Sequence, residues 1–120
     1  MKQVLIVDDS PEDCKHLTKI MEKNDFSVIT ADDGEKGVEK AKQEKPDLIL
    51  MDVVMPNLNG FQATRKIKKN PDTADIPVIM ITTKSNETDK IWAKRQGVDI
   101  FITKPVKANE LNKAIEEIFE

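Results

Sequence analysis

Three carboxylates that follow short apolar runs predict one acidic site. Asp8 and Asp9 come directly after the run 4–7, and Asp52 directly follows the run 48–51. Apolar runs of this length that end in a charge are typical of strands buried on both faces of a parallel sheet, whose carboxyl ends meet at one edge. Carboxylates gathered there raise one another's pKa unless a cation neutralises them, and hard oxygen ligands favour Mg²⁺ over zinc. The pattern therefore predicts a magnesium-dependent phosphoryl site.

Strand-like and helix-like segments alternate along the chain and would position these residues. The expected strands are 3–7, 26–30, 48–52, 78–82 and 100–103. Apolar residues at helical spacing fill the segments between them, and Ser10, Asp33 and Asn86 are placed to cap three of the helices. Repeated βα units imply an α/β fold with a doubly wound, five-stranded parallel sheet covered by helices on both faces. The flavodoxin-like strand order 2-1-3-4-5 would place the first and third strands side by side and bring the carboxylates together.

The composition favours one compact domain over residues 1–120. A single cysteine cannot form an internal disulfide, and no apolar segment approaches the ~20 residues that span a bilayer. No apolar segment follows a basic start, so secretion is not expected. The 19 Lys and Arg residues against 22 Asp and Glu argue against attraction to nucleic acid or to an anionic membrane. We therefore expect a cytoplasmic protein, with no nucleic-acid binding and no membrane insertion, whose partner is another protein.

Over its whole length the chain resembles the CheY-like receiver domains of response regulators. The resemblance rests on motifs that follow one another in the expected order and spacing: Val7-Asp8-Asp9-Ser10, Met51-Asp52, Met55-Pro56, Gly60, Ile81-Thr82 and Thr103-Lys104-Pro105. Each motif is weak alone, and together they are specific. Within this family, the stretches 59–65 and 82–97 are similar to PilH and PilG, the receivers of type IV pilus twitching motility.

The resemblance implies a role for each site residue. Asp52 would accept a phosphoryl group from the phosphohistidine of a sensor histidine kinase or a phosphotransfer domain. Mg²⁺ would be held by Asp9, Asp52 and the backbone carbonyl of Val54, and by Asp8 either directly or through a coordinated water. Lys104 would contact a phosphoryl oxygen, or Asp52 before transfer, and the bond to the following proline would be cis.

The resemblance also implies a switch and an output. Thr82 would move toward the phosphoryl group, and Phe101 would change rotamer into the vacated space. The changed surface would comprise the fourth helix, the fifth strand and the fifth helix, and it would bind a separate target protein. No output domain is expected beyond Glu120, so the chain would be a stand-alone signalling protein rather than an enzyme.

Three residues depart from the better-known chemotaxis pattern of this family. Val54 has no polar group that could position a hydrolytic water, and Lys84 places a cation near the mouth of the site. We therefore expect dephosphorylation to be slow or to depend on a partner. Phe101 replaces the commoner tyrosine, so the switch cannot use a ring hydroxyl.

Simpler readings of the same residues remain open. An acid after a strand often caps a helix, Thr82 suits a strand by its β-branching alone, and Phe101 suits a core. His16 is expected to be solvated by helical periodicity, and Cys14 to be a small buried residue.

Other functional classes fit less well. A phosphatase of the haloacid-dehalogenase type would need an acid where Val54 stands. A flavodoxin-type carrier would meet an acidic segment, residues 8–13, where it needs a phosphate loop. A receiver-fold binding module or phosphate sink, without phosphorylation-dependent output, is the alternative that the sequence leaves open.

Overall fold

The computed structural model describes residues 1–83 and 86–120, which form five parallel strands and five helices. The strands are β1 (Lys2–Val7), β2 (Phe26–Ala31), β3 (Leu48–Asp52), β4 (Val78–Thr82) and β5 (Ile100–Thr103). They lie in the order β2-β1-β3-β4-β5, which confirms the predicted topology. Three of the five predicted strands, those at 48–52, 78–82 and 100–103, have the predicted bounds.

Four of the five helices begin at the polar side chains that local capping requires. The helices are α1 (Pro11–Lys23), α2 (Gly34–Glu44), α3 (Gly60–Lys69), α4 (Glu87–Arg95) and α5 (Ala108–Phe119). The side-chain oxygens of Ser10, Asp33, Asn59 and Asn86 each accept a hydrogen bond from the backbone N–H three residues on. At α5 the N-cap position is held by Lys107, which makes no such bond.

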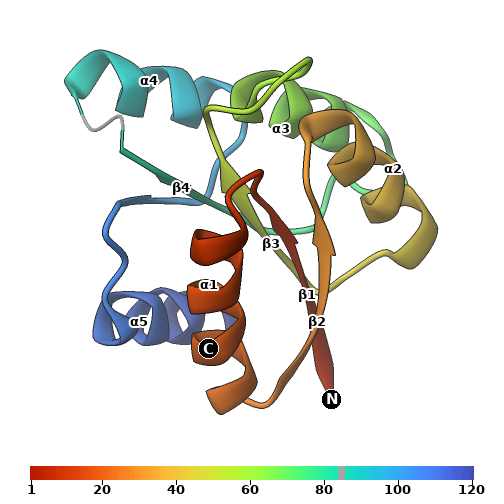
Figure 1. Ribbon diagram of the computed structural model, residues 1–120. Coiled ribbons are helices and arrows are strands. Elements are labelled where there is room, and N and C mark those ends of the chain that lie inside the picture. The colour runs from red at the N-terminus through yellow and green to blue at the C-terminus, as the bar shows by residue number, and fades with distance from the viewer. Residues whose placement is uncertain (84–85) are drawn as a thin grey trace.

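The sheet separates two apolar cores. Figure 1 shows α1 and α5 on one face of the sheet, and α2, α3 and α4 on the other. Leu17 and Leu111 belong to the core of the first face, whereas Val38, Ile67 and Ala93 belong to that of the second. The central strands β1, β3 and β4 supply side chains to both cores, which is why they are apolar at consecutive positions instead of alternating.

Strand register brings the predicted site residues to one edge of the sheet. In the β1–β3 pairing Val7 lies opposite Met51, so Asp8 and Asp52 follow at the same level. Thr82 and Thr103 are paired at the ends of β4 and β5, directly before Lys104. Among the residues described, no helix has both the length and the apolar character to cross a membrane.

The packing of α1 changes two interpretations. Cys14 is only partly buried, at the margin of the first core, and burial raises the pKa of its thiol. His16 is on the exposed side of α1 as predicted, but it is not simply solvated, because its ring Nε2–H donates a 2.8 Å hydrogen bond to the carbonyl of Val106. Periodicity within one helix carries no information about such a distant contact. Lys84 lies outside the described residues.

Candidate functional site

Asp8, Asp9 and Asp52 form one cluster at the carboxyl edge of the sheet. Each contributes a carboxylate oxygen, and these oxygens all lie within 4.8 Å of one another. Asp8 and Asp52 are buried, the latter 7% exposed, whereas Asp9 faces solvent. The prediction that these three carboxylates lie close together is therefore confirmed.

A backbone N–H fixes each of the two buried carboxylates. The N–H of Ser10 donates to Asp8 Oδ1 at 2.9 Å, and the N–H of Val53 donates to Asp52 Oδ1 at 2.8 Å. Both donors lie in the segments that directly follow β1 and β3, so the local backbone sets the direction of each side chain. The acids are preorganised before any ligand binds.

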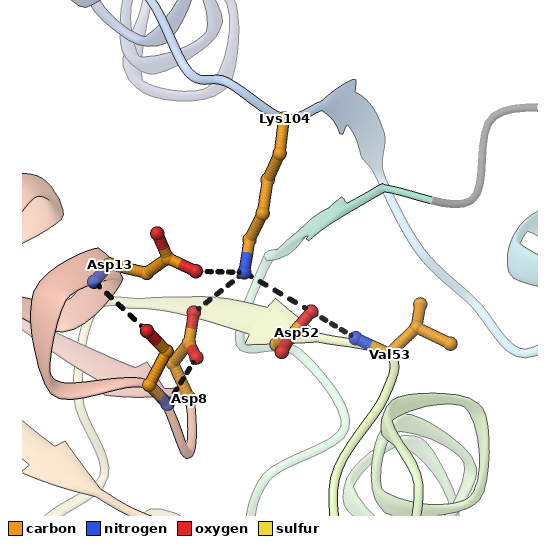
Figure 2. Close-up of polar contacts among 6 residues, drawn as sticks. Asp8, Asp13, Asp52, Val53 and Lys104 are labelled. Atoms are coloured by element: carbon orange, nitrogen blue, oxygen red, sulfur yellow. Dashed lines mark hydrogen bonds and ion pairs between the residues drawn. The ribbon is translucent and has the colours of Figure 1, made fainter.

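Lys104 extends from the loop between β5 and α5 into the acidic cluster (Figure 2). Its Nζ lies 2.8 Å from Asp13 Oδ2, 3.1 Å from Asp8 Oδ2 and 3.6 Å from Asp52 Oδ1. The Lys104-Pro105 bond is cis, as predicted. The predicted approach of Lys104 to Asp52 is present, but it is the longest of the three ion pairs.

Asp13 is a site residue that the sequence reasoning missed. Its only signal in the sequence was its place in the first turn of α1, where an acid is favoured by the helix dipole. Its contact with Lys104 spans 91 positions, so it depends on the path of the loop after β5. That path is a tertiary property which no local pattern encodes.

Burial and mutual repulsion dominate the electrostatics of the site. Burial, followed by the charge of Asp8, raises the pKa of Asp52 from its ordinary 3.8 to about 6. For Lys104, burial lowers the pKa, but the hydrogen bond to Asp13 and the charges of Asp52 and Asp8 outweigh this effect, so the pKa is raised. The cluster thus carries negative charge that Lys104 does not fully offset. A hard divalent cation with oxygen ligands fits this donor set.

Of the two predicted switch residues, Thr82 lies on β4, the strand next to that of Asp52, and Phe101 lies on β5, one strand further out. Thr82 is buried at the end of β4, and its carbonyl accepts a 2.8 Å hydrogen bond from the backbone N–H of Lys104. Phe101 is partly buried on β5, opposite Met80. Val54, two residues beyond Asp52, exposes 55% of its surface. These positions are compatible with the predicted roles, which stay predictions.

The sequence matches the response regulator receiver domain family over residues 4–116. The chain belongs to this family. Receiver domains are signalling proteins, in keeping with the expected class. This receiver is 52% identical to the protein PilH of Pseudomonas aeruginosa over 118 residues, which cover 98% of each chain. The narrower resemblance to PilH is thereby confirmed.

Solved structures of similar chains have the same fold, and two of them include magnesium. The receiver is 27% identical to the receiver domain of a sensor histidine kinase from Pseudomonas aeruginosa, with a TM-score of 0.91 and coverage of 99% and 98% of the two chains. That structure contains a magnesium ion coordinated in the active site cleft. The receiver is also 31% identical to a chain of the CheX-CheY-BeF₃-Mg complex of Borrelia burgdorferi, with a TM-score of 0.93 and coverage of 99% and 90%.

Proposed function

We propose that this receiver takes a phosphoryl group on Asp52 and passes its phosphorylation state to a separate protein. The donor would be the phosphohistidine of a sensor histidine kinase or of a phosphotransfer domain. One observation carries the proposal most directly: the buried Asp52 carboxylate, oriented by the Val53 N–H, belongs to a cluster of three carboxylates and has the ammonium of Lys104 3.6 Å away.

The chemistry requires an ionised Asp52. With a pKa of about 6, its carboxylate is mostly ionised at neutral pH and can attack phosphorus through an oxygen. The new bond joins that oxygen to phosphorus, while the bond from phosphorus to the imidazole nitrogen of the donor breaks and the imidazole leaves with its electron pair. Mg²⁺ held by Asp8, Asp9, Asp52 and the Val54 carbonyl would neutralise charge on the transferred group. Lys104 would contact a phosphoryl oxygen.

The switch that we propose runs from Asp52 on β3 through the neighbouring strand β4 to β5 at the edge of the sheet. Thr82 would turn its hydroxyl toward the phosphoryl group, and Phe101 would move into the space released. The backbone N–H of Lys104 donates a hydrogen bond to the Thr82 carbonyl. This bond supports the route, because it joins the main chain of Lys104 to that of the proposed switch residue.

We propose α4, β5 and α5 as the surface that meets the target. Ile91 and Trp92 on α4 are 52% and 50% exposed, and exposed apolar side chains of this size commonly anchor protein interfaces. The identity to PilH supports a role in type IV pilus twitching motility.

The first experiment is intact mass measurement after incubation with phosphoramidate, whose P–N bond resembles that of phosphohistidine, and Mg²⁺. We expect a gain of one phosphoryl group, about 80 Da, in the wild-type chain and none in Asp52→Asn or in EDTA. A gain in Asp52→Asn equal to that of the wild type would place the acceptor elsewhere. No gain even with a phosphorylated histidine kinase domain would favour a binding module that acts without phosphorylation.

The exposed Val54 leads to a prediction about phosphoryl lifetime. Val54→Asn would add an amide able to hold an attacking water beside Asp52, so we expect dephosphorylation to become about tenfold faster. The measurement is the loss of phosphoryl mass after rapid removal of donor. Val54→Ala, which changes size without adding a polar group, is the matched control and should retain the slow rate. A wild-type lifetime of only seconds would contradict the slow hydrolysis on which this prediction depends.

A further inference from the structure

Two polar contacts join α1 to the loop that carries Lys104. The Asp13 carboxylate meets Lys104 Nζ at 2.8 Å, and the ring of His16 meets the Val106 carbonyl at 2.8 Å. Asp13 and His16 are three residues apart, so they lie on the same face of α1. We call this pair of contacts the α1 clamp.

The clamp spans a gap in the packing. A cavity of about 60 Å³ lies between α1 and the loop, and Asp13, His16 and Lys104 line it together with apolar side chains such as Leu17 and Ile81. Close apolar packing, which would fix the loop by contact on all sides, is incomplete at this point. The polar contacts of the clamp therefore have a large part in setting where the Lys104 side chain lies.

Lys104 cannot satisfy all its partners equally. Its Nζ is 0.8 Å nearer to Asp13 than to Asp52, as the distances of 2.8 and 3.6 Å show. Asp13 lies outside the three-carboxylate cluster that would hold a cation. A phosphoryl group on Asp52 adds negative charge on the far side of the ammonium from Asp13 (Figure 2). Asp13 and the phosphoryl group thus compete for one cation.

We propose that Asp13 is a positioning residue that holds Lys104 back from Asp52 and so limits the rate of phosphoryl uptake. The inference rests on the proposed function of Asp52 and deepens it. On phosphorylation the Asp13–Lys104 contact lengthens, while the contact between His16 and Val106 keeps the loop attached to α1. Asp13 is 45% exposed on its side chain, so its hold on Lys104 is weak enough to be broken during each transfer.

The test compares Asp13→Asn with Glu12→Gln in the full chain. Both changes remove one acid from the first turn of α1, but in the described structure the ion pairs of Lys104 are with Asp8, Asp13 and Asp52 only. We expect initial uptake from phosphoramidate with Mg²⁺ to rise about three- to fivefold in Asp13→Asn and to stay near the wild-type rate in Glu12→Gln. A rate that is unchanged or lower in Asp13→Asn overturns the proposal.

A double-mutant cycle separates positioning from a general charge effect. In a Lys104→Met background, Asp13→Asn should no longer accelerate uptake, because the cation that it restrains is absent. Equal acceleration in both backgrounds would show that Asp13 acts only through its charge, and would overturn the proposal.

A second readout needs neither Mg²⁺ nor phosphoryl transfer. In heteronuclear NMR of the lysine side-chain amino groups, Asp13→Asn should shift the Lys104 signal and Glu12→Gln should leave it in place. An unshifted Lys104 signal in a folded Asp13→Asn protein overturns the proposed clamp. If Lys104→Met takes up no phosphoryl group, the double-mutant cycle cannot be read, and the NMR result alone decides whether Asp13 positions Lys104. If the wild-type chain takes up none from phosphoramidate or from a phosphorylated histidine kinase domain, the proposed function fails, and the control of uptake by Asp13 fails with it.

Discussion

In Mg²⁺-free buffer, Asp52→Asn is expected to be more stable toward unfolding than the wild-type chain above pH 6, by about 2 kcal/mol. The pKa of Asp52 is raised from 3.8 in an unfolded reference to about 6 in the folded chain, so between these values the folded state binds the proton and the unfolded state does not. Wild-type stability must therefore fall as the pH rises through this window. The gap between the two pKa values sets a ceiling of about 3 kcal/mol at ~1.36 kcal/mol per unit. The asparagine keeps an oxygen for the Val53 N–H but removes a partner of Lys104, which places the expected gain below the ceiling.

Urea unfolding at a series of pH values measures this effect. The two proteins should converge toward pH 4, and Mg²⁺ should narrow their difference at neutral pH by binding the folded wild type. Asp75→Asn, at an exposed position away from the cluster, is the control and should follow the wild-type curve. Parallel curves for wild type and Asp52→Asn across this range would show that the carboxylate is not strained by its surroundings.

Gly60→Ala is expected to destabilise the fold by more than about 3 kcal/mol. A Cβ at this position would lie 2.0 Å from the carbonyl oxygen of Asp52, which belongs to the backbone and cannot rotate away. The Gly60 N–H also donates to the Val53 carbonyl at 2.9 Å, so the start of α3 is pressed against the end of β3. Relief of the clash requires that α3 move away from the site.

Gly97→Ala is the matched control for this substitution. Gly97 has a φ of +94°, and an alanine there would meet chiefly the flexible side chain of Lys68. We expect a cost of about 1–2 kcal/mol, from backbone strain alone. Thermal or urea unfolding of both variants makes the comparison, and equal losses would show that the close approach of Gly60 to Asp52 is not what constrains this loop.

The parts of the fold that could be predicted from sequence are those set by local or periodic rules. Apolar runs located β3 and β4 because a strand buried on both faces has no polar alternation to obscure it. Ser10, Asp33 and Asn86 marked helix starts because capping is satisfied within three residues of the side chain. The carboxylate cluster followed from the strand order, which was an assumption at the level of the fold that the residues alone do not prove.

The contacts that escaped prediction all cross between distant segments. Asp13 and His16 were interpreted from their own helix alone, as a dipole-favoured acid and a solvated imidazole. Their partners, Lys104 and Val106, come from a loop whose path depends on how β5 ends and how α5 docks. The order of the three Lys104 distances likewise depends on tertiary geometry within a few tenths of an ångström, beyond the reach of residue types and spacing.

The separation of the two apolar cores has a consequence for how such a protein can diversify. Asp52 lies at the carboxyl edge of the sheet, between the two helix layers, so the proposed phosphorylation would act on both faces: on α1 through Lys104 and Asp13, and on α4 through β4 and β5 in the proposed switch. Substitutions in one core are shielded from the other by the sheet, and their effects should be nearly additive. In the proposed function, the rate of phosphoryl uptake and the specificity for the target protein could thus change independently, through substitutions on opposite faces of the sheet.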